Sequence, residues 1–312
     1  MLGDPVTTLC ARCFRNCCIL LLRPTGEGHQ LNFLPSCMAR TLLIVVWLGT
    51  APCSTAMVYG EDDRERQTYH DMYHLKSVGI VVAGSYVGVG TLAMRGDVMV
   101  TSAHVVYDEL GQLRSHQVSF FPDGDPKKKV VVDLTQSHAG NILVRPGQLQ
   151  DDWIILRLTR DVLADNTNQG FNSVRILLVT SLNFDQLRDN IVHVSFDFRR
   201  RPVRKLVNRK CQFYRKERGD MFWGIPSILL HDCDLGRRDN SGSPIFYSDG
   251  GVYYLVGLHE GSHKDFYGSA FNPRINPNFA FGVNDEFKKA INEFLGTRNI
   301  VVPVDQKPSC ID

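Results

Sequence analysis

The sequence predicts an all-β fold of two antiparallel barrels followed by one C-terminal helix. Two series of short apolar runs, separated by polar turn clusters, cover residues 77–160 and 173–283. Short strands with regular turn signals are typical of closed antiparallel barrels. The segment from Asn284 to Leu295 begins with a capping residue and early acids, and its apolar residues fall on one face. This segment predicts a helix that docks by its apolar side.

The two series are built from similar runs. The first consists of VGIVVAG, YVGVGTLAM, DVMVTSA, VSFF, KVVVDL, NILV and WIILRL. After a polar crossing from Arg160 to Asn172, the second consists of SVRILLVTS, NIVHVSFDF, CQFY, SILLHDC, SPIFY, VYYLVGLHE and NFAFGV. Each run is short enough for a single strand, so each series predicts one barrel.

Composition and charge are those of an ordinary globular protein, with 43% hydrophobic and 22% charged residues among 312. The formal net charge of +2 does not indicate a nucleic-acid-binding protein, which normally carries a stronger basic excess. The basic run from Arg199 to Lys210 raises nucleic acid as an alternative partner. Because this run contains Pro202 and no aromatic residue, we expect a solvated loop between strands and no bound nucleic acid.

The segment that begins at Met38 has the layout of a secretory signal peptide. A short basic start is followed by an apolar run from Leu42 to Leu48 and by small residues up to Ala56. We expect translation to start at Met38 and cleavage near Ala56, and a membrane-anchored amino terminus or lipid attachment at Cys53 are the alternatives. The run is shorter than the roughly 20 residues that span a bilayer. We therefore expect a secreted or periplasmic protein without a stable membrane anchor.

Cysteine placement fits an oxidising destination. Cys211 and Cys233 are expected to form a disulfide that stabilises the fold by roughly 3 kcal/mol, and two reduced core cysteines are the alternative. Cys310 is left without an expected partner. The early cysteines do not have paired zinc-finger spacing, and we expect no metal.

The turn NSGSP contains the strongest candidate for chemistry. Ser241 follows a cysteine-bearing strand and precedes an apolar one, which suits an exposed nucleophile, whereas a capping turn serine is the alternative. A serine nucleophile needs a histidine base that a carboxylate holds. His104 ends the apolar run VMVTSAH, and Asp152 opens WIILRL. The chain order of histidine, aspartate and serine is that of two-barrel proteases and not of subtilisins or α/β-hydrolases.

These blocks resemble a known family. TSAH, DW-I-L-RL and NSGSP are similar to the three catalytic blocks of the chymotrypsin-fold, or trypsin-like, serine endopeptidases. VYGEDDR at 58–64 and GLHEG at 257–261 resemble the bacterial branch that includes the glutamyl endopeptidases. The resemblance covers 58–296. It implies two six-stranded barrels with a cleft between them, and hydrolysis of peptide or protein substrates through an acyl-enzyme without a cofactor.

The resemblance also implies a role for each residue of the triad. Ser241 would attack the carbonyl carbon, and His104 would act first as base and then as acid. Asp152 would accept the other imidazole N–H. Alternation along the strand places Asp151 and Asp152 on opposite faces, and the family pattern of an aspartate directly before tryptophan selects Asp152. Asp151 is then expected to face solvent.

One position departs from the family pattern. The backbone N–H groups of Ser241 and Asp239 would form the oxyanion hole, but the family has glycine where this chain has Asp239. A carboxylate there would oppose the developing oxyanion unless Arg237 or Arg238 pairs with it. This departure motivates the alternative of a catalytically weak homologue that binds peptides. Asn240 stands where trypsin-like zymogens have an activating aspartate, so activation by a new amino terminus is not implied.

Substrate preference is suggested by His259. It matches the pocket histidine with which glutamyl endopeptidases hold an acidic side chain, and Gly257, Gly236 and Arg237 are the other expected substrate-binding residues. The threonine that those enzymes carry upstream of the serine is replaced by Gly236. A packed strand residue is the alternative for His259, and ester hydrolysis is an alternative to peptide hydrolysis.

The predicted organisation has six parts, and we expect a monomer. They are an upstream extension with signal peptide at 1–56, an N-terminal arm at 57–76, the first barrel at 77–160, the second barrel at 173–283, the helix at 284–296 and a tail at 297–312. The arm contains the charge run EDDRER, which predicts a solvated segment.

Overall fold

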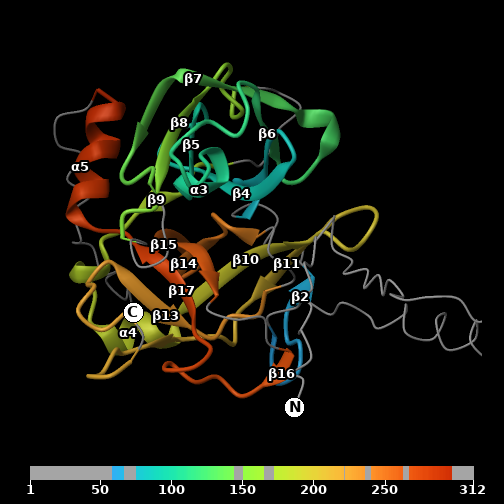
Figure 1. Ribbon diagram of the computed structural model, residues 1–312. Helices are drawn as coiled ribbons and strands as arrows, with labels where there is room; N and C mark the ends of the chain where they lie inside the picture. The colour runs from blue at the N-terminus through green and yellow to red at the C-terminus, as the bar shows by residue number, and fades with distance from the viewer. Residues whose placement is uncertain are drawn as a thin grey trace, which may run out of the picture. The chain divides into compact units, whose positions relative to one another are not determined.

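The computed structural model describes residues 58–66, 75–143, 150–164, 172–220, 222–235, 240–262 and 267–296. Strands dominate the described residues and their helices are short, which confirms the predicted all-β class (Figure 1). The expected signal peptide, its cleavage site near Ala56, Cys310 and the tail lie outside the described residues.

The first barrel is closed and antiparallel, as predicted. Its hydrogen-bonded order is β3-β4-β5-β8-β7-β6, drawn in cyan and green in Figure 1. Buried valine, leucine, isoleucine and phenylalanine side chains from all six strands fill its interior. The strands are β3 (Val78–Ala83), β4 (Tyr86–Leu92), β5 (Val98–Thr101), β6 (Val118–Pro122), β7 (Val130–Ala139) and β8 (Ile154–Leu158), with the one-turn helix α3 (Ala103–Val106) after β5 and the 3₁₀ turn η1 (Pro126–Lys128) after β6.

The second half is a nine-stranded sheet with six longer strands and three two-residue strands. Its order is β12-β13-β17-β15-β14-β10-β11-β2, and β9 pairs with β15. The predicted second barrel is thus a curled sheet that hydrogen bonds between described residues do not close, with β12 at one edge and β2 from the arm at the other. The longer strands are β10 (Ile191–Asp197), β11 (Arg204–Asn208), β13 (Ile228–His231), β14 (Pro244–Asp249), β15 (Val252–Ser262) and β17 (Asn278–Gly282), and the short ones are β2 (Glu65–Arg66), β9 (Arg175–Ile176) and β12 (Phe213–Tyr214).

The remaining elements are short, except for the terminal helix. The pair β1 (Val58–Tyr59) and β16 (Tyr267–Ser269) forms a small parallel sheet, and η3 (Val179–Ser181) and α4 (Phe184–Asp189) lie between β9 and β10.

The predicted C-terminal helix is confirmed as α5 (Asp285–Phe294). Asn284 caps it by accepting a hydrogen bond from the backbone N–H of Phe287, at 2.9 Å. The Phe287 ring packs on Trp153, which precedes β8, and on Phe281 of β17, with ring centroids 5.1 and 5.7 Å apart. The helix therefore packs on both the first barrel and the second sheet where they meet.

The charge run of the N-terminal arm is largely exposed, as expected for Glu61, Asp62, Glu65 and Arg66, but the Arg64 side chain is withdrawn from solvent. The backbone N–H groups of Tyr59 and Asp63 donate to the Asp234 carboxylate, at 2.8 and 3.2 Å. The Arg64 side chain is 1% exposed and pairs with Asp62. Strand β2 also pairs with β11. An arm whose backbone extends a sheet can thus bury one charged side chain while its neighbours stay exposed.

The basic run from Arg199 is only partly a solvated loop. Its later part forms β11, where alternation turns Lys205 inward, and this lysine is 9% exposed. The Lys205 ammonium contacts Asp123 and donates to the carbonyl of Leu75 at 2.8 Å. At the turn itself, Arg199 pairs with Asp197 at 2.9 Å. These ion pairs neutralise part of the charge that suggested a nucleic-acid surface.

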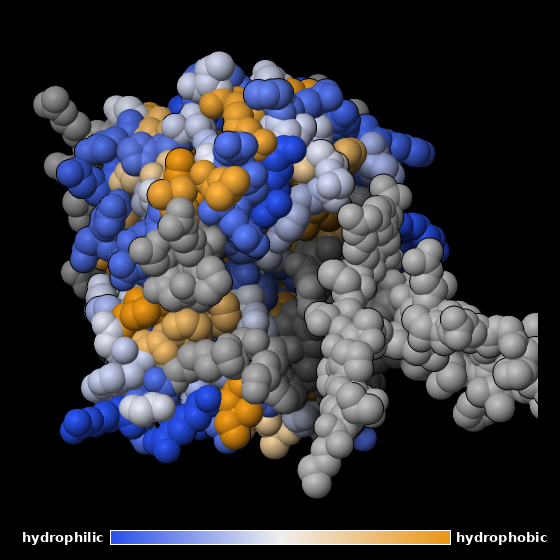
Figure 2. All heavy atoms as spheres, viewed as in Figure 1, coloured by the Kyte–Doolittle hydropathy of each residue, from blue (hydrophilic) through white to orange (hydrophobic). Residues whose placement is uncertain are grey.

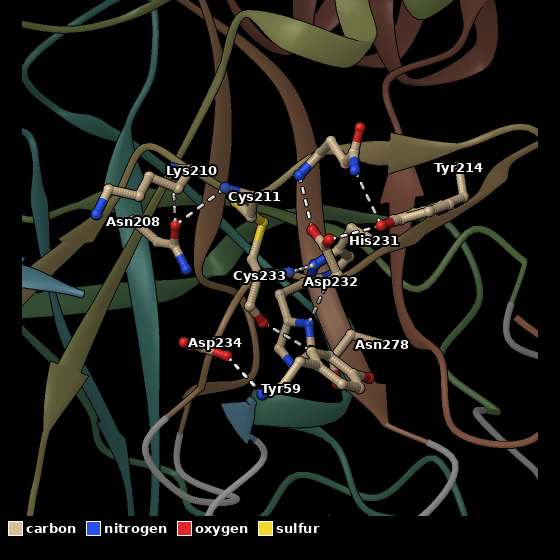
Figure 3. The surroundings of a disulfide bond; sticks show 12 residues. Tyr59, Asn208, Lys210, Cys211, Tyr214, His231, Asp232, Cys233, Asp234 and Asn278 are labelled. Carbon is tan, nitrogen blue, oxygen red and sulfur yellow. Dashed lines mark hydrogen bonds between the residues drawn. A yellow bond between two sulfur atoms is a disulfide. The ribbon is translucent and has the colours of Figure 1, made fainter. Parts of the chain in front are cut away.

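The expected disulfide between Cys211 and Cys233 is present (Figure 3). It joins the start of β12 to the end of β13 across 22 residues. Asp234, one residue beyond it, is the carboxylate that holds the N-terminal arm. The bridge therefore fixes the strand that leads towards Ser241.

The visible face carries hydrophobic residues in small groups among hydrophilic ones (Figure 2). Exposed large hydrophobic side chains include Leu110, Trp223 and Ile275, each more than half exposed. None of the described helices is both long enough and apolar enough to cross a membrane.

Candidate active site

His104 and Asp152 form a close pair at one end of the first barrel. Strand β5 ends just before His104 and strand β8 begins just after Asp152, and these strands pair with Thr101 opposite Ile154. His104 Nδ1 lies 2.5 Å from Asp152 Oδ2, and the His104 backbone N–H donates to Asp152 Oδ1 at 3.0 Å. Asp152 is fully buried, whereas the His104 side chain is 17% exposed. The imidazole is therefore anchored through Nδ1 while part of the ring stays accessible.

Asp151 is directed elsewhere. Its backbone has a positive φ of 64°, and its carbonyl accepts from the N–H of Trp153 at 2.9 Å. Its partly exposed carboxylate accepts a hydrogen bond from the side-chain amide of Asn284 at 3.2 Å. It is therefore Asp152 that meets His104.

The turn that carries Ser241 is tight and internally bonded. The Ser243 N–H donates to the Asn240 carbonyl at 3.0 Å, and Gly242 adopts a φ of +80°. The Asn240 side chain accepts from the N–H of Phe196 at 2.8 Å and donates to its carbonyl at 3.1 Å. An ionised carboxylate at this position could accept the first of these bonds but could not donate the second. Asn240 thus fixes the turn to strand β10 without an ion pair.

This turn docks directly on the first barrel. The Ser241 carbonyl accepts from the Val89 N–H at 2.8 Å, and the Gly242 N–H donates to the His259 carbonyl at 2.7 Å. The same carbonyl accepts from Ser102 Oγ at 3.2 Å. Ser102 lies two residues before His104. The structure therefore brings the three predicted catalytic segments together, and Ser241 itself is 6% exposed.

Several expected site residues cannot be placed. Gly236, Arg237, Arg238 and Asp239 lie outside the described residues. Gly257 lies within the sheet, opposite Ile245 on one side and Gly282 on the other.

His259 belongs to a row of three buried histidines, one each from β10, β13 and β15. His193, His231 and His259 are all at most 2% exposed. His231 Nε2 lies 3.2 Å from His259 Nδ1, and the rings of His193 and His231 are 6.0 Å apart. Within the described part of the chain, neither ring nitrogen of His193 has a hydrogen-bond partner.

The tautomers along the row follow from its hydrogen bonds. The backbone N–H of Cys233 donates to His231 Nδ1 at 3.2 Å, so a neutral His231 carries its proton on Nε2. His231 Nε2–H then donates to His259 Nδ1, which leaves the proton of a neutral His259 on Nε2. His259 can therefore offer an N–H donor from that nitrogen.

Burial keeps the whole row uncharged near neutral pH. Desolvation, with the positive charge of Arg64 as a second cause, lowers the pKa of His193 to about 3. Burial and the neighbouring histidines lower the pKa of His231 and of His259 well below the ordinary histidine value. Any anion that the row binds would be held by N–H donors and not by a charged imidazolium.

His193 and His231 were not among the residues predicted from the sequence. Each is a single histidine at an inward-facing position of an otherwise apolar run, NIVHVSF and SILLH. That pattern is a usable signal, because an unpaired histidine in a core strand needs a reason. Strand pairing is required to see that the three histidines meet.

Comparison with known proteins supports the fold. No protein-family model matches the sequence, and no curated protein matches it significantly. A solved Glu endopeptidase in complex with MPD is 16% identical, with a TM-score of 0.56 over 76% of this chain and 98% of that one. A thermostable serine protease from an extremophilic microorganism is 13% identical, with a TM-score of 0.51 over 72% of this chain and 100% of that one. The chain therefore has the predicted chymotrypsin-like fold, and these matches do not distinguish the glutamyl branch from others.

Gly242→Ala should disrupt the serine turn. A Cβ at this position would lie 2.1 Å from Thr101 Oγ1 and 2.3 Å from the Val89 carbonyl oxygen, in a backbone conformation that disfavours side chains. We expect the free energy of unfolding, measured by urea denaturation, to fall by about 2 kcal/mol or more. Gly251→Ala is the matched control, since Gly251 has a φ of +84° but no atom within 4 Å of its Cβ position. Equal losses in the two variants would contradict the packing argument.

His193→Leu should reduce the pH dependence of the free energy of unfolding below pH 6.5. Because the folded pKa is lowered from 6.5 to about 3, the stability that neutral His193 contributes is present above pH 6.5 and lost as the pH falls towards 3. The loss in the wild type approaches about 1.4 kcal/mol per pH unit within this window. We expect the slope of the variant to be shallower by this amount in urea denaturation at stepped pH, because His231 and His259 keep their own lowered pKa values.

The control for His193→Leu is Ser195→Ala, which changes another buried side chain of β10 that does not titrate. It should keep the wild-type slope. A His193→Leu profile as steep as that of the wild type would contradict the assignment.

Proposed function

We propose that this chain is a serine endopeptidase in which Ser241 is the nucleophile, His104 the general base and Asp152 the carboxylate that orients the base. The observation that carries the proposal is the docking of the serine turn beside the His104–Asp152 pair. Two hydrogen bonds to the His259 carbonyl, from Gly242 N–H and Ser102 Oγ, tie that turn to the segment that carries His104.

The hydrogen bond between His104 Nδ1 and Asp152 assigns the proton of the neutral imidazole to Nδ1. His104 Nε2 is then free to take the Ser241 hydroxyl proton as Oγ attacks the carbonyl carbon of the substrate. The tetrahedral intermediate collapses when the imidazolium gives this proton to the leaving amine. A water molecule then attacks the acyl-enzyme, with His104 again as base, and releases the acid and Ser241.

The developing oxyanion needs N–H donors that are fixed in advance. The backbone N–H groups of Ser241 and Asp239 are our candidates, and a well-aimed donor of this kind contributes about 3 kcal/mol to the rate. Gly242 and Asn240 hold the turn rigidly on either side of Ser241. The carboxylate of Asp239 would work against this stabilisation, so the enzyme is expected to depend on a compensating arginine, Arg237 or Arg238.

We further propose a preference for an acidic side chain on the acyl side of the cleaved bond. Support comes from the Nε2–H of neutral His259, which can donate to a carboxylate, and from the placement of His259 directly behind the serine turn. The Glu endopeptidase among the structural matches agrees with this preference without establishing it.

We also propose that the protein acts outside the cytoplasm. Support comes from the disulfide between Cys211 and Cys233, which persists in oxidising compartments, and from the signal-peptide pattern that ends near Ala56.

Labelling with a fluorophosphonate tests the triad. The wild type should react at Ser241, while Ser241→Ala and His104→Ala should not, because the probe requires an activated serine. Asp152→Asn should slow labelling by about 10⁴-fold, since its amide cannot hold the imidazole in the right tautomer. Mass spectrometry of the labelled peptide identifies the site.

The matched control for labelling is Ser243→Ala, which removes a buried hydroxyl without a partner two residues away. It should label like the wild type. A folded wild type that reacts no faster than Ser241→Ala would contradict the catalytic proposal and favour the alternative of a peptide-binding homologue.

Cleavage of a peptide library tests the acidic preference. We expect kcat/KM for glutamate to exceed that for glutamine at the same position by at least about tenfold. His259→Leu should reduce this ratio because the Nε2–H donor is lost, whereas Ser195→Ala should keep it. An unchanged ratio in His259→Leu would show that His259 is only a packed strand residue.

A further inference from the structure

Glu260 is a buried carboxyl group that the triad does not use. It follows His259 on β15 and is 4% exposed. Both of its carboxyl oxygens are buried and have no hydrogen-bond partner among the residues that the structure describes. An acid in this setting is costly, because its charged form has lost its water and gained nothing in return. Such a residue calls for a functional reason.

The backbone at Glu260 forms a β-bulge. On β17, Ala280 lies opposite His259 and Phe279 lies opposite Gly261, so Glu260 is the extra residue that pairs with neither. Bulges redirect a side chain relative to its neighbours in the strand. The preceding carbonyl, that of His259, is the one that binds both the serine turn and Ser102. A movement of the bulge would therefore displace the turn that carries Ser241.

The charges that act on Glu260 belong to the triad segment. Burial first, and then the negative charges of Asp152 and Asp151, raise the pKa of Glu260 well above its ordinary value. Phe279 and Ala280 of β17, which lie opposite the bulge, do not titrate. On its own strand, His259 is kept neutral by burial. Burial and the charges of both aspartates thus favour the protonated form of Glu260.

We propose that Glu260 is a positioning residue that acts through the bulge and the His259 carbonyl, and that it must keep its proton for His104 and Ser241 to stay aligned. When Glu260 ionises, an uncompensated negative charge appears inside the sheet at the bulge. The bulge shifts to relieve the burial of this charge, and the His259 carbonyl moves away from Gly242 and Ser102. This inference rests on the proposed serine endopeptidase function.

The direction of the pH effect follows from the raised pKa. Because the folded chain favours the protonated acid more than the unfolded chain does, the stabilising contribution is complete below the ordinary glutamate value of 4.5 and is lost as the pH rises through the folded value. Alignment of the triad should be lost where Glu260 ionises in the folded chain, at a pH well above the ordinary glutamate value. Activity should therefore fall as the pH rises through this ionisation.

The pH dependence of kcat/KM in the wild type and in Glu260→Gln tests the proposal. Glutamine has the same shape but cannot ionise. Above the ionisation of Glu260 the wild type should lose about tenfold in kcat/KM per pH unit, as expected for an essential protonated group, and the variant should lack this limb. Glu286→Gln, at an exposed position of α5, is the matched control and should keep the wild-type limb. The same alkaline limb in Glu260→Gln would overturn the proposal.

A second readout does not depend on turnover. In a Ser241→Ala background, the downfield NMR resonance of the His104 Nδ1 proton reports the bond to Asp152 directly. It should shift with an alkaline inflection when Glu260 is present and show no such inflection in Ser241→Ala/Glu260→Gln. If Glu260→Gln does not fold, Glu260→Met, also uncharged and of similar length, takes its place.

The two readouts separate this inference from the proposed function. A protein that cleaves no peptide but shows the Glu260-dependent inflection would refute the endopeptidase assignment and retain the link between Glu260 and the His104–Asp152 pair. A resonance that does not move with pH in either background would overturn the positioning role.

Discussion

The carbonyl oxygen of His259 is the contact on which the site depends. It accepts the Gly242 N–H from the serine turn and Ser102 Oγ from the first barrel. Three segments far apart in the sequence thus share one acceptor, so the barrel and the sheet cannot slide against each other without breaking it. Nothing larger than glycine fits at Gly242, because Thr101 and Val89 occupy the space. Close packing of backbone on backbone, and not an ion pair between the halves, holds the serine turn in place.

The positions of the first-barrel strands along the chain could be anticipated from local signals, and the partner of His104 from the family pattern that the sequence resembles. Apolar runs of strand length mark β3 to β8, and an aspartate directly before tryptophan marks Asp152. The burial of Arg64 could not be anticipated, since its charge run resembles any solvated segment. Neither could the histidine row or the bulge at Glu260. Both depend on which residues face each other across strands, and a one-residue change of register would undo them.

In the core of the second sheet, three histidines and one glutamate are buried in their uncharged forms. His193, His231 and His259 are uncharged because burial disfavours the imidazolium, and Glu260 is uncharged because burial and two aspartates disfavour the carboxylate. An uncharged surrounding strengthens the field of any charge that enters it, since little remains to screen that charge. A developing imidazolium at His104 would therefore respond strongly to Asp152.

The N-terminal arm has a consequence for the sheet as a whole. Strand β2 pairs with β11 and so ends the row of strands on that side, where β11 would otherwise present unpaired N–H and C=O groups. Exposed strand edges invite pairing with other chains. The Asp234 carboxylate, which binds the backbone of the same arm, thus helps to keep the edge of β11 covered.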